Sequence, residues 1–282
     1  MSTSVSVGRV RGVARRRWIA SVVLLVVSVG FLLPAAWLLL SSIDPEAGLS
    51  TELPATFTFE NFASVMNVEL LWRPMAVSLI LSGGGALIAV VVAILAAYPL
   101  SRFNFKINNF YMYAILFASG LPIIAMMVPV YSVFVSLGMI DSIGGTTFFL
   151  AATQLPMSVF MMKTFMDNVP VGLEEAAWID GASRMVALRR IVVPLLGPGI
   201  ATVSIFVFVM IWGNFFVPFI LLLSPDQMPL AVTIFAFFGQ HGQVGYGQIA
   251  AYSILYTIPA IVLYLIVSRR FGLFALAGGV KG

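Results

Sequence analysis

Six long apolar stretches are the feature that most constrains this chain, because each is long enough to cross a lipid bilayer as a helix. They run approximately over residues 18–40, 76–100, 109–135, 144–162, 196–223 and 247–268. A helical span needs about 20 apolar residues to cross roughly 30 Å of hydrocarbon, where backbone polar groups must bond within their own helix. The sequence therefore predicts an all-α, polytopic membrane protein with six transmembrane helices.

Composition agrees with this fold class and excludes several kinds of site. Apolar residues make up 61% and charged residues 9% of the chain, whereas soluble domains carry roughly 45–50% and ~25%. The chain has no cysteine and one histidine, His241. Disulfides and thiolate metal sites are therefore excluded, and we expect neither a metal nor a cofactor in this chain.

The first apolar stretch follows five arginines and superficially resembles a secretory signal peptide. It is longer than the roughly 7–15 apolar residues of such a signal, and it lacks a small-x-small cleavage site. We therefore predict a retained first span, preceded by a basic cytoplasmic tail over residues 1–17 that lies near anionic lipid.

The placement of basic residues predicts the orientation of the spans. All but one of the 15 Lys and Arg residues lie in the N-terminal tail, the 101–108 and 163–195 loops and the C-terminal tail. Arg73 alone lies in the opposite set of loops. Because Lys and Arg accumulate in cytoplasmic loops, both termini are predicted to be cytoplasmic. The transmembrane domain then covers 18–270, and 271–282 forms a cytoplasmic tail.

The interiors of the six stretches contain no Asp, Glu, Lys or Arg. Ion-coupled transporters and proton pumps usually carry such residues there, so their absence disfavours a secondary transporter. That alternative stays open for a neutral solute, because backbone carbonyls also bind sodium, and a non-transporting scaffold is a further alternative.

The run Gly83–Gly85 favours close helix packing over a hinge. Kinks or breaks are expected at Pro122, Pro129, Pro156 and Pro218.

The segment 169–198 is too polar to span a membrane and reads VPVGLEEAAWIDGASRMVALRRIVVPLLGP. Pro170 suits the first turn of a helix, and Glu174 lies near the positive end of that helix. Gly181 can adopt the left-handed backbone that ends a helix, and Ser183 can cap a second one. The pattern predicts a helix, a sharp turn and a second helix that leads into the fifth stretch.

One spacing within this segment resembles a known family. The matching residues are Glu175, Ala176 and Ala177, then Asp180, Gly181 and Ala182, then Ile191, Pro194 and Pro198. They resemble the EAA loop of binding-protein-dependent ABC importers, with Leu188 and Val193 as apolar departures from the usual residues. The alternative is an ordinary amphipathic connector.

The resemblance implies that this loop is a coupling helix that docks into a cytoplasmic ATPase subunit. The residues expected to make or shape that contact are Glu174, Glu175, Ala176, Ala177, Asp180, Gly181 and Ala182. By resemblance, Glu175 would pair with a basic or polar group, the two alanines would permit close seating, and Gly181 would make the turn.

Four further segments resemble the carbohydrate-uptake branch, of the maltose and glycerol-phosphate permease type. They are Thr56–Val65, Leu95–Phe103, Val128–Asp141 and Arg269–Gly282. The likeness is greatest to the shorter, six-span permease of a heterodimer, whose tail lies along the ATPase. The corresponding tail residues are Gly279, Lys281 and Gly282.

The resemblance also implies the partners. They are a second permease subunit, two ATP-binding cassette subunits that bind ATP and Mg, and an extracytoplasmic solute-binding protein. This chain would itself be no enzyme, would lie in the cytoplasmic membrane, and would form part of the path for a sugar or related solute. The candidates for that path are Trp212, Asn214, Phe215 and Gln154, since sugar sites pair aromatic faces with hydrogen-bonding groups. The alternative for these residues is helix packing with an interhelical hydrogen bond.

Overall fold

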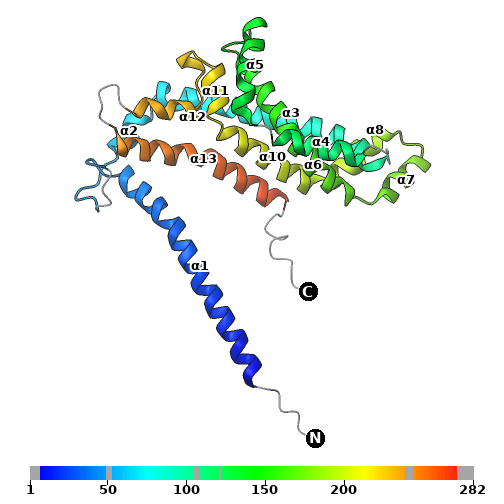
Figure 1. The fold of residues 1–282 in the computed structure, drawn as a ribbon, viewed down its shortest axis with the longest axis horizontal. Helices are drawn as coiled ribbons and strands as arrows, with labels where there is room; N and C mark the ends of the chain where they lie inside the picture. The colour runs from blue at the N-terminus through cyan, green and yellow to red at the C-terminus, as the bar shows by residue number, and fades with distance from the viewer. Residues whose placement is uncertain (1–6, 49–52, 104–107, 121, 239–243, 272–282) are drawn as a thin grey trace. The chain divides into compact units, whose positions relative to one another are not determined.

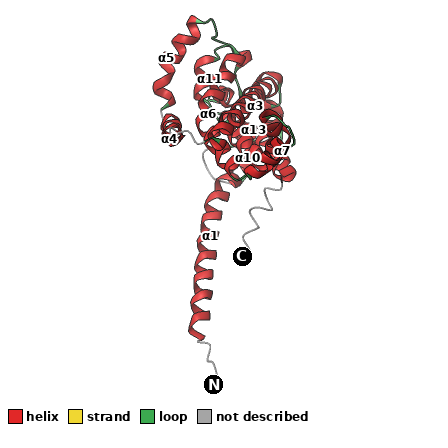
Figure 2. Cartoon of the chain, turned by 90° about the vertical axis from the view of Figure 1, so that its right-hand side faces the viewer, coloured by secondary structure: helices red, strands yellow, loops and turns green. Residues whose placement is uncertain are grey.

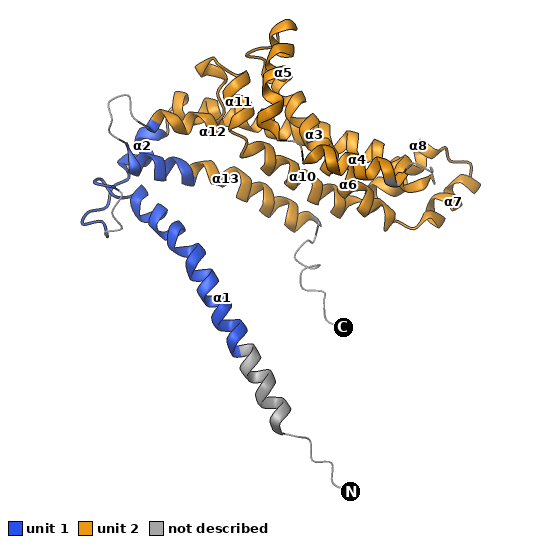
Figure 3. Ribbon diagram, viewed as in Figure 1, with its two compact units in different colours: residues 1–65, 237–254 blue, residues 66–236, 255–282 orange. Residues whose placement is uncertain are grey.

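The described residues of this protein are almost entirely helical (Figure 2). The computed structural model describes residues 7–48, 53–103, 108–120, 122–238 and 244–271. Within these ranges the only β-pairing is an isolated bridge between Phe238 and Val244. The predicted all-α class is therefore confirmed. The chain divides into two compact units, which are residues 1–65 with 237–254 and residues 66–236 with 255–282 (Figure 3).

The longer helices follow one another in chain order from blue to red in Figure 1. They are α1 (Val7–Ser42), α3 (Arg73–Arg102), α4 (Asn108–Ser119), α5 (Ile123–Ser136), α6 (Ile143–Asp167), α7 (Val171–Ile179), α10 (Gly197–Trp212) and α13 (Tyr246–Phe271). The shorter elements are α2 (Glu60–Val65), η1 (Val68–Trp72), α8 (Arg184–Ala187), η2 (Leu188–Val192), α9 (Val193–Leu195), α11 (Phe216–Leu221), η3 (Pro225–Gln227), α12 (Leu230–Thr233) and η4 (Ile234–Phe237).

The first unit joins the end of α1, the short helix α2 and the beginning of α13. The side-chain amide of Asn61 donates to the carbonyl oxygens of Ser42 and Asp44, at 3.2 and 2.9 Å. Gln248 of α13 donates to the hydroxyl of Ser64 at 3.2 Å. The apolar window of α1 has no buried residue, so the described part of this helix offers its apolar surface to lipid or to another subunit.

The second unit is built on α3, which packs most extensively against α6 and then against α10. Small side chains line the buried face of α3, and they are Ser78, Ser82, Gly85, Ala86, Ala89, Ala93 and Ala97. Small residues let helix backbones approach closely, which is the main source of helix association inside a bilayer. This packing places the carboxyl ends of α3 and α6 next to each other.

Glycines act as contact points in this core, as the sequence predicted for the run Gly83–Gly85. A side chain at Gly84 or Gly85 would press against Thr147 or Ile211 of the neighbouring helices, whereas Gly83 faces open space. Gly199 of α10 lies flat against Phe165 of α6. Packing, and not a hinge, therefore accounts for the two glycines that meet another helix.

The described residues contain three helices that are long and apolar enough to cross a membrane, Trp18–Ser42, Val68–Arg102 and Tyr246–Arg270. Two bent helix pairs raise the number to five if each pair is one span. The predicted stretch 144–162 is helical within α6 but lies outside this set, and its threonines and Gln154 lower its hydropathy. The total of six spans stays a prediction.

Two predicted spans are interrupted in the structure. The stretch 109–135 breaks at Pro122, which caps α5, and α4 and α5 meet at 87°. The stretch 196–223 breaks after Trp212, where Gly213 ends α10 and the side chain of Asn214 accepts from the backbone of Val217 in α11. A proline or a glycine followed by a capping amide ends a helix, so each break has a local cause.

Candidate functional site

The loop between α6 and α10 forms a helix, a turn and a second helical run. Helix α7 begins after Pro170 and ends at Asp180, and Gly181 then adopts a left-handed backbone with φ +87°. The hydroxyl of Ser183 accepts from the amide of Val186 at 3.4 Å and caps α8. The turn and the cap both occur where the sequence predicted them, and the helical run continues through η2 and α9.

One face of α7 is free of contacts with the rest of the described chain. Ile179 is 86% exposed and Leu173 is 46% exposed, and Glu175, Ala176 and Asp180 are also exposed. Ala177 and Ala182 are half-buried. Large apolar side chains on a polar loop are unfavourable in water unless a partner covers them. This face is therefore a candidate docking surface.

Glu174 departs from the role that the sequence predicted. Its side chain is completely buried, and its carboxylate accepts from Arg102 Nε at 2.6 Å and from the Tyr98 hydroxyl at 2.8 Å. A carboxylate enclosed in this way does not face a partner. The prediction that Glu174 takes part in docking is therefore corrected. Glu174 and Glu175 are adjacent in α7, so their side chains point in different directions, and that of Glu174 points inward.

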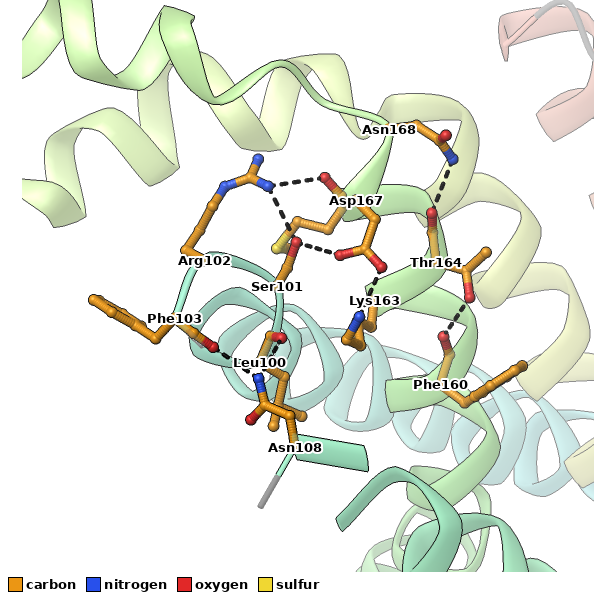
Figure 4. A network of polar contacts seen from close by, with 11 residues as sticks. Leu100, Ser101, Arg102, Phe103, Asn108, Phe160, Lys163, Thr164, Asp167 and Asn168 are labelled. Carbon is orange, nitrogen blue, oxygen red and sulfur yellow. Dashed lines mark hydrogen bonds and ion pairs between the residues drawn. The ribbon is translucent and has the colours of Figure 1, made fainter. Parts of the chain in front are cut away.

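Arg102 sits at the centre of a polar network between the ends of α3 and α6 (Figure 4). Its Nη1 donates to the carbonyl oxygen of Met166 at 3.2 Å and to the Ser101 hydroxyl at 3.1 Å, and its Nη2 donates to the carbonyl oxygen of Val169 at 3.1 Å. Ser101 donates in turn to Asp167, at 2.6 Å. Sequence reasoning missed Arg102 and its neighbours, although Tyr98 and Arg102 stand four residues apart on one helix face.

A cavity of about 440 Å³ lies between α4, α5, α6 and Asn214 in the connection between α10 and α11. Its lining residues are Ala118, Ser119, Ile123, Met126, Ala152, Thr153, Gln154, Pro156 and Asn214. Gln154 donates to Thr153 at 3.2 Å, and the oxygen of Asn214 accepts from Val217 at 3.1 Å. Among the described residues, no hydrogen bond engages the side-chain oxygen of Gln154 or the side-chain nitrogen of Asn214, and no ionisable side chain is among the described lining residues.

The two aromatic candidates for the solute path lie elsewhere. Trp212 is 5% exposed, stacks between Phe208 and Tyr256 at 5.4 and 5.5 Å, and donates to the carbonyl oxygen of Tyr256 at 3.2 Å. Phe215 stacks on Phe219 at 4.9 Å and lies at a tilt against Phe235 at 4.8 Å, as measured between ring centroids. Their rings are used in helix packing, so only Gln154 and Asn214 of the four predicted residues line the cavity.

A second polar cluster ties two connections together away from the coupling loop. Asp141, in the turn between α5 and α6, accepts from the amides of Leu223 and Ser224 at 2.5 and 2.8 Å and from the Ser224 hydroxyl at 3.0 Å. Donation by the Ser224 backbone is the largest cause that holds the pKa of Asp141 below its ordinary value, against a smaller opposing effect of burial. Arg73 and Asp226 form an exposed ion pair in the same unit.

The predicted tail contacts Gly279, Lys281 and Gly282 lie outside the described residues. Within the described ranges, no group of three or more metal-ligating side chains is close enough to hold an ion.

The chain is similar to membrane transport proteins over nearly its whole length. The profile of the family described as "Binding-protein-dependent transport system inner membrane component" matches residues 89–274. The diacetylchitobiose uptake system permease protein DasC of Streptomyces coelicolor is 28% identical over 281 residues, which cover 96% of this chain and 99% of the relative.

One further relative and one solved structure agree with this similarity. The trehalose transport system permease protein SugB of Mycobacterium tuberculosis is 30% identical over 254 residues, covering 89% of this chain and 93% of the relative. A chain from the crystal structure of a bacterial ABC transporter involved in the import of the acidic polysaccharide alginate aligns with a TM-score of 0.77. It is 20% identical, and the alignment covers 96% of this chain and all of that chain.

Proposed function

Because this chain belongs to the family of binding-protein-dependent transport system inner membrane components, we propose that it is one of two membrane-spanning subunits of an ATP-driven importer for a sugar. In this proposal the chain crosses the membrane six times with both termini in the cytoplasm. A second permease subunit completes the path, two ATPase subunits bind ATP and Mg, and a binding protein delivers the solute outside.

The exposed tip of α7 is the observation that carries the proposed coupling. Leu173, Ala176 and Ile179 offer an apolar surface beside the carboxylate of Glu175. An apolar centre with a charged rim is the usual anatomy of a protein interface. A cytoplasmic ATPase subunit is the proposed partner, since the tip lies in a loop that carries four basic residues, Lys163, Arg184, Arg189 and Arg190, as cytoplasmic loops do.

The cavity supports a neutral, polyhydroxylated solute. Amide and hydroxyl groups of Gln154, Asn214 and Ser119 share the lining with apolar side chains. Such a lining can exchange hydrogen bonds with sugar hydroxyls, and the missing ionisable groups leave no counter-charge for an ionic solute. The names of the relatives, which include uptake systems for diacetylchitobiose and trehalose, agree with this solute class.

The test is ATP hydrolysis by the assembled complex in lipid, with the binding protein and a panel of trehalose, maltose, melibiose and diacetylchitobiose. We expect sugar-loaded binding protein to stimulate hydrolysis. Glu175→Lys reverses a charge at the proposed interface, and Gly181→Trp places a bulky side chain there. Each variant should lower the stimulated rate by roughly tenfold or more or cause the ATPase subunits to dissociate.

Glu69→Lys is the matched control, because it reverses an exposed carboxylate in η1, which lies between the predicted spans 18–40 and 76–100 and which the proposal places on the other side of the membrane. Normal assembly and normal stimulation in both α7 variants would show that the loop is only a connector. Sugar uptake by the chain without any ATPase subunit would instead favour a secondary transporter.

A further inference from the structure

The last turn of α3 holds both helices of the loop that follows α6. Tyr98 and Arg102 bind the buried carboxylate of Glu174 in α7. The guanidinium of Arg184, at the start of α8, lies 4.9 Å from the ring centroid of Phe103 and 5.8 Å from that of Trp178 in α7. Tyr98 and Arg102, one helical turn apart in α3, therefore contact α7 directly, and Phe103, the residue after α3, contacts Arg184 of α8.

The pair of Arg102 and Glu174 is enclosed and fully hydrogen-bonded. Their side chains are 4% and 0% exposed. Arg102 also donates to the carbonyl oxygens of Met166 and Val169, at the end of α6 and just beyond it. A buried ion pair holds its geometry strongly, because separating the partners leaves an uncompensated charge away from water. One guanidinium therefore fixes α7 to α3 and α6 at the same time.

Neighbouring residues of α7 divide the helix into a held face and a free face. Glu174 is buried against α3, while Glu175 and Ile179 are exposed. A force applied to the free face reaches the held face through about one helical turn of backbone. Without the ion pair, α7 would lose its link through Arg102 to the end of α6 and would stay joined to it by the chain between Asn168 and Pro170.

We propose that Arg102 is a positioning residue for ATP coupling, because its buried pair with Glu174 makes α7 and the α3–α6 pair move as one body. The inference rests on the proposed function, in which an ATPase subunit binds the free face of α7. The pair transmits displacement of the loop directly into the packed core, since α3 is also the helix on which α6 and α10 pack.

The test measures the distance between spin labels at Val171→Cys in α7 and Leu95→Cys in α3, both exposed positions in a chain that has no other cysteine. The complete complex in lipid is compared with and without the nucleotide analogue AMP-PNP. With Arg102 and Glu174 intact, we expect one narrow distance distribution that the nucleotide does not change. In Arg102→Met/Glu174→Gln, which leaves no unpaired charge, we expect the distribution to broaden and to shift with AMP-PNP.

The same variants are measured for ATP hydrolysis stimulated by the sugar-loaded binding protein, relative to the basal rate. We expect the ratio in the double variant to fall by roughly five- to tenfold, the size of a typical coupling between two sites. Arg102→Met alone should assemble less well than the double variant, since it leaves the carboxylate buried without a counter-charge. Glu174→Gln alone keeps the size of the side chain but offers one acceptor oxygen in place of two and leaves Arg102 without a counter-charge, and we expect an intermediate ratio.

Lys163→Met is the control, because it removes a cation from the more exposed pair of Lys163 with Asp167 in the same network. A narrow, nucleotide-independent distribution in the double variant overturns the proposal, as does a wild-type stimulation ratio in that variant. A nucleotide-dependent distance with the pair intact overturns it as well. Failure of the proposed function is recognised separately, by Glu175→Lys retaining full assembly and stimulation.

Discussion

At the scale of single residues, Asp141 has a structural role that its neighbours in the sequence do not predict. It has a left-handed backbone with φ +60°, which costs a non-glycine residue some strain unless surrounding contacts hold it. The contacts here are the amides of Leu223 and Ser224 on its carboxylate and the carbonyl oxygen of Leu221 on its own amide, at 2.9 Å. Asp141 thus joins the turn after α5 to the segment after α11.

Asp141→Asn tests this contact, because asparagine tolerates the left-handed backbone but loses the charge. Folding lowers the pKa of Asp141 below its ordinary value of 3.8. Its stabilisation is therefore present above that value and is lost as the pH falls through the lowered pKa. We expect Asp141→Asn to lower the apparent melting temperature of the complex at pH 7, and we expect this difference to shrink as the pH falls below 3.8.

The matched variant is Asp226→Asn, which removes the exposed ion pair with Arg73. Exposed pairs contribute little, so its melting temperature at pH 7 should stay close to that of the unchanged complex. An equal decrease in both variants, or a decrease in Asp141→Asn that persists at acid pH, would contradict the assigned role.

Glu174 and Glu175 show how far sequence reasoning reaches at a candidate site. The spacing located the loop, the turn at Gly181 and the exposed acidic residue. It did not separate two adjacent glutamates, because the inward direction is set by Arg102, which lies on another helix far away in the chain. Residues that act through long-range contacts are invisible to local patterns. The choice between the solute path and helix packing stayed open for Trp212 for the same reason, since its partner Tyr256 belongs to α13.

At the scale of helices, the contact of Gly199 with Phe165 leads to a second prediction. A Cβ atom at Gly199 would lie 2.6 Å from Phe165 Cγ and 2.7 Å from Phe165 Cβ, and neither atom can move without displacing α6. We expect Gly199→Ala to destabilise the complex by about 1–3 kcal/mol through overpacking. Unfolding of the complex in a titration with denaturing detergent measures this.

Gly83→Ala is the control for that prediction, because a Cβ at Gly83 meets nothing within 4 Å. Alanine is favoured over glycine in a helix by roughly 1 kcal/mol, so this variant should be unchanged or more stable. Destabilisation of both variants to the same extent would show that helix propensity, and not the contact with Phe165, decides the outcome.

The sequence predicted where the long helices lie, but it predicted only some of the points at which they are interrupted. Long apolar stretches can adopt few structures in a bilayer, and all six are helical over most of their described length. The break at Pro122 follows from a residue type that is visible in the sequence. The break after Trp212 was missed, because Gly213 and Asn214 end a helix only when the amide of Asn214 caps the next one.

At the scale of the whole molecule, the proposed topology makes a prediction that cysteine labelling can check. The chain has no cysteine, so single cysteines at two exposed positions, Met185→Cys and Phe57→Cys, can be labelled without background from this chain. In intact cells, a membrane-impermeant maleimide should label the cysteine at Phe57 and not the one at Met185. After the membrane is opened, both should react.

Labelling at Met185 alone in intact cells would show the opposite orientation, and labelling of both sites in intact cells would contradict the predicted topology. A variant with the cysteine at Ser64, on the same proposed side as Phe57, serves as a second reporter for the outside. Ser64 is exposed, so labelling in intact cells is expected there as well.

The enclosed pair of Arg102 and Glu174 also constrains how this chain diverges over evolutionary time. If the arginine is replaced first, the buried carboxylate has no counter-charge. If the glutamate is replaced first, the buried guanidinium has no counter-charge. Both intermediates are selected against, so the two positions are expected to change together or not at all. Glu175 and Ile179 have no such internal tie and remain free to follow changes in the partner.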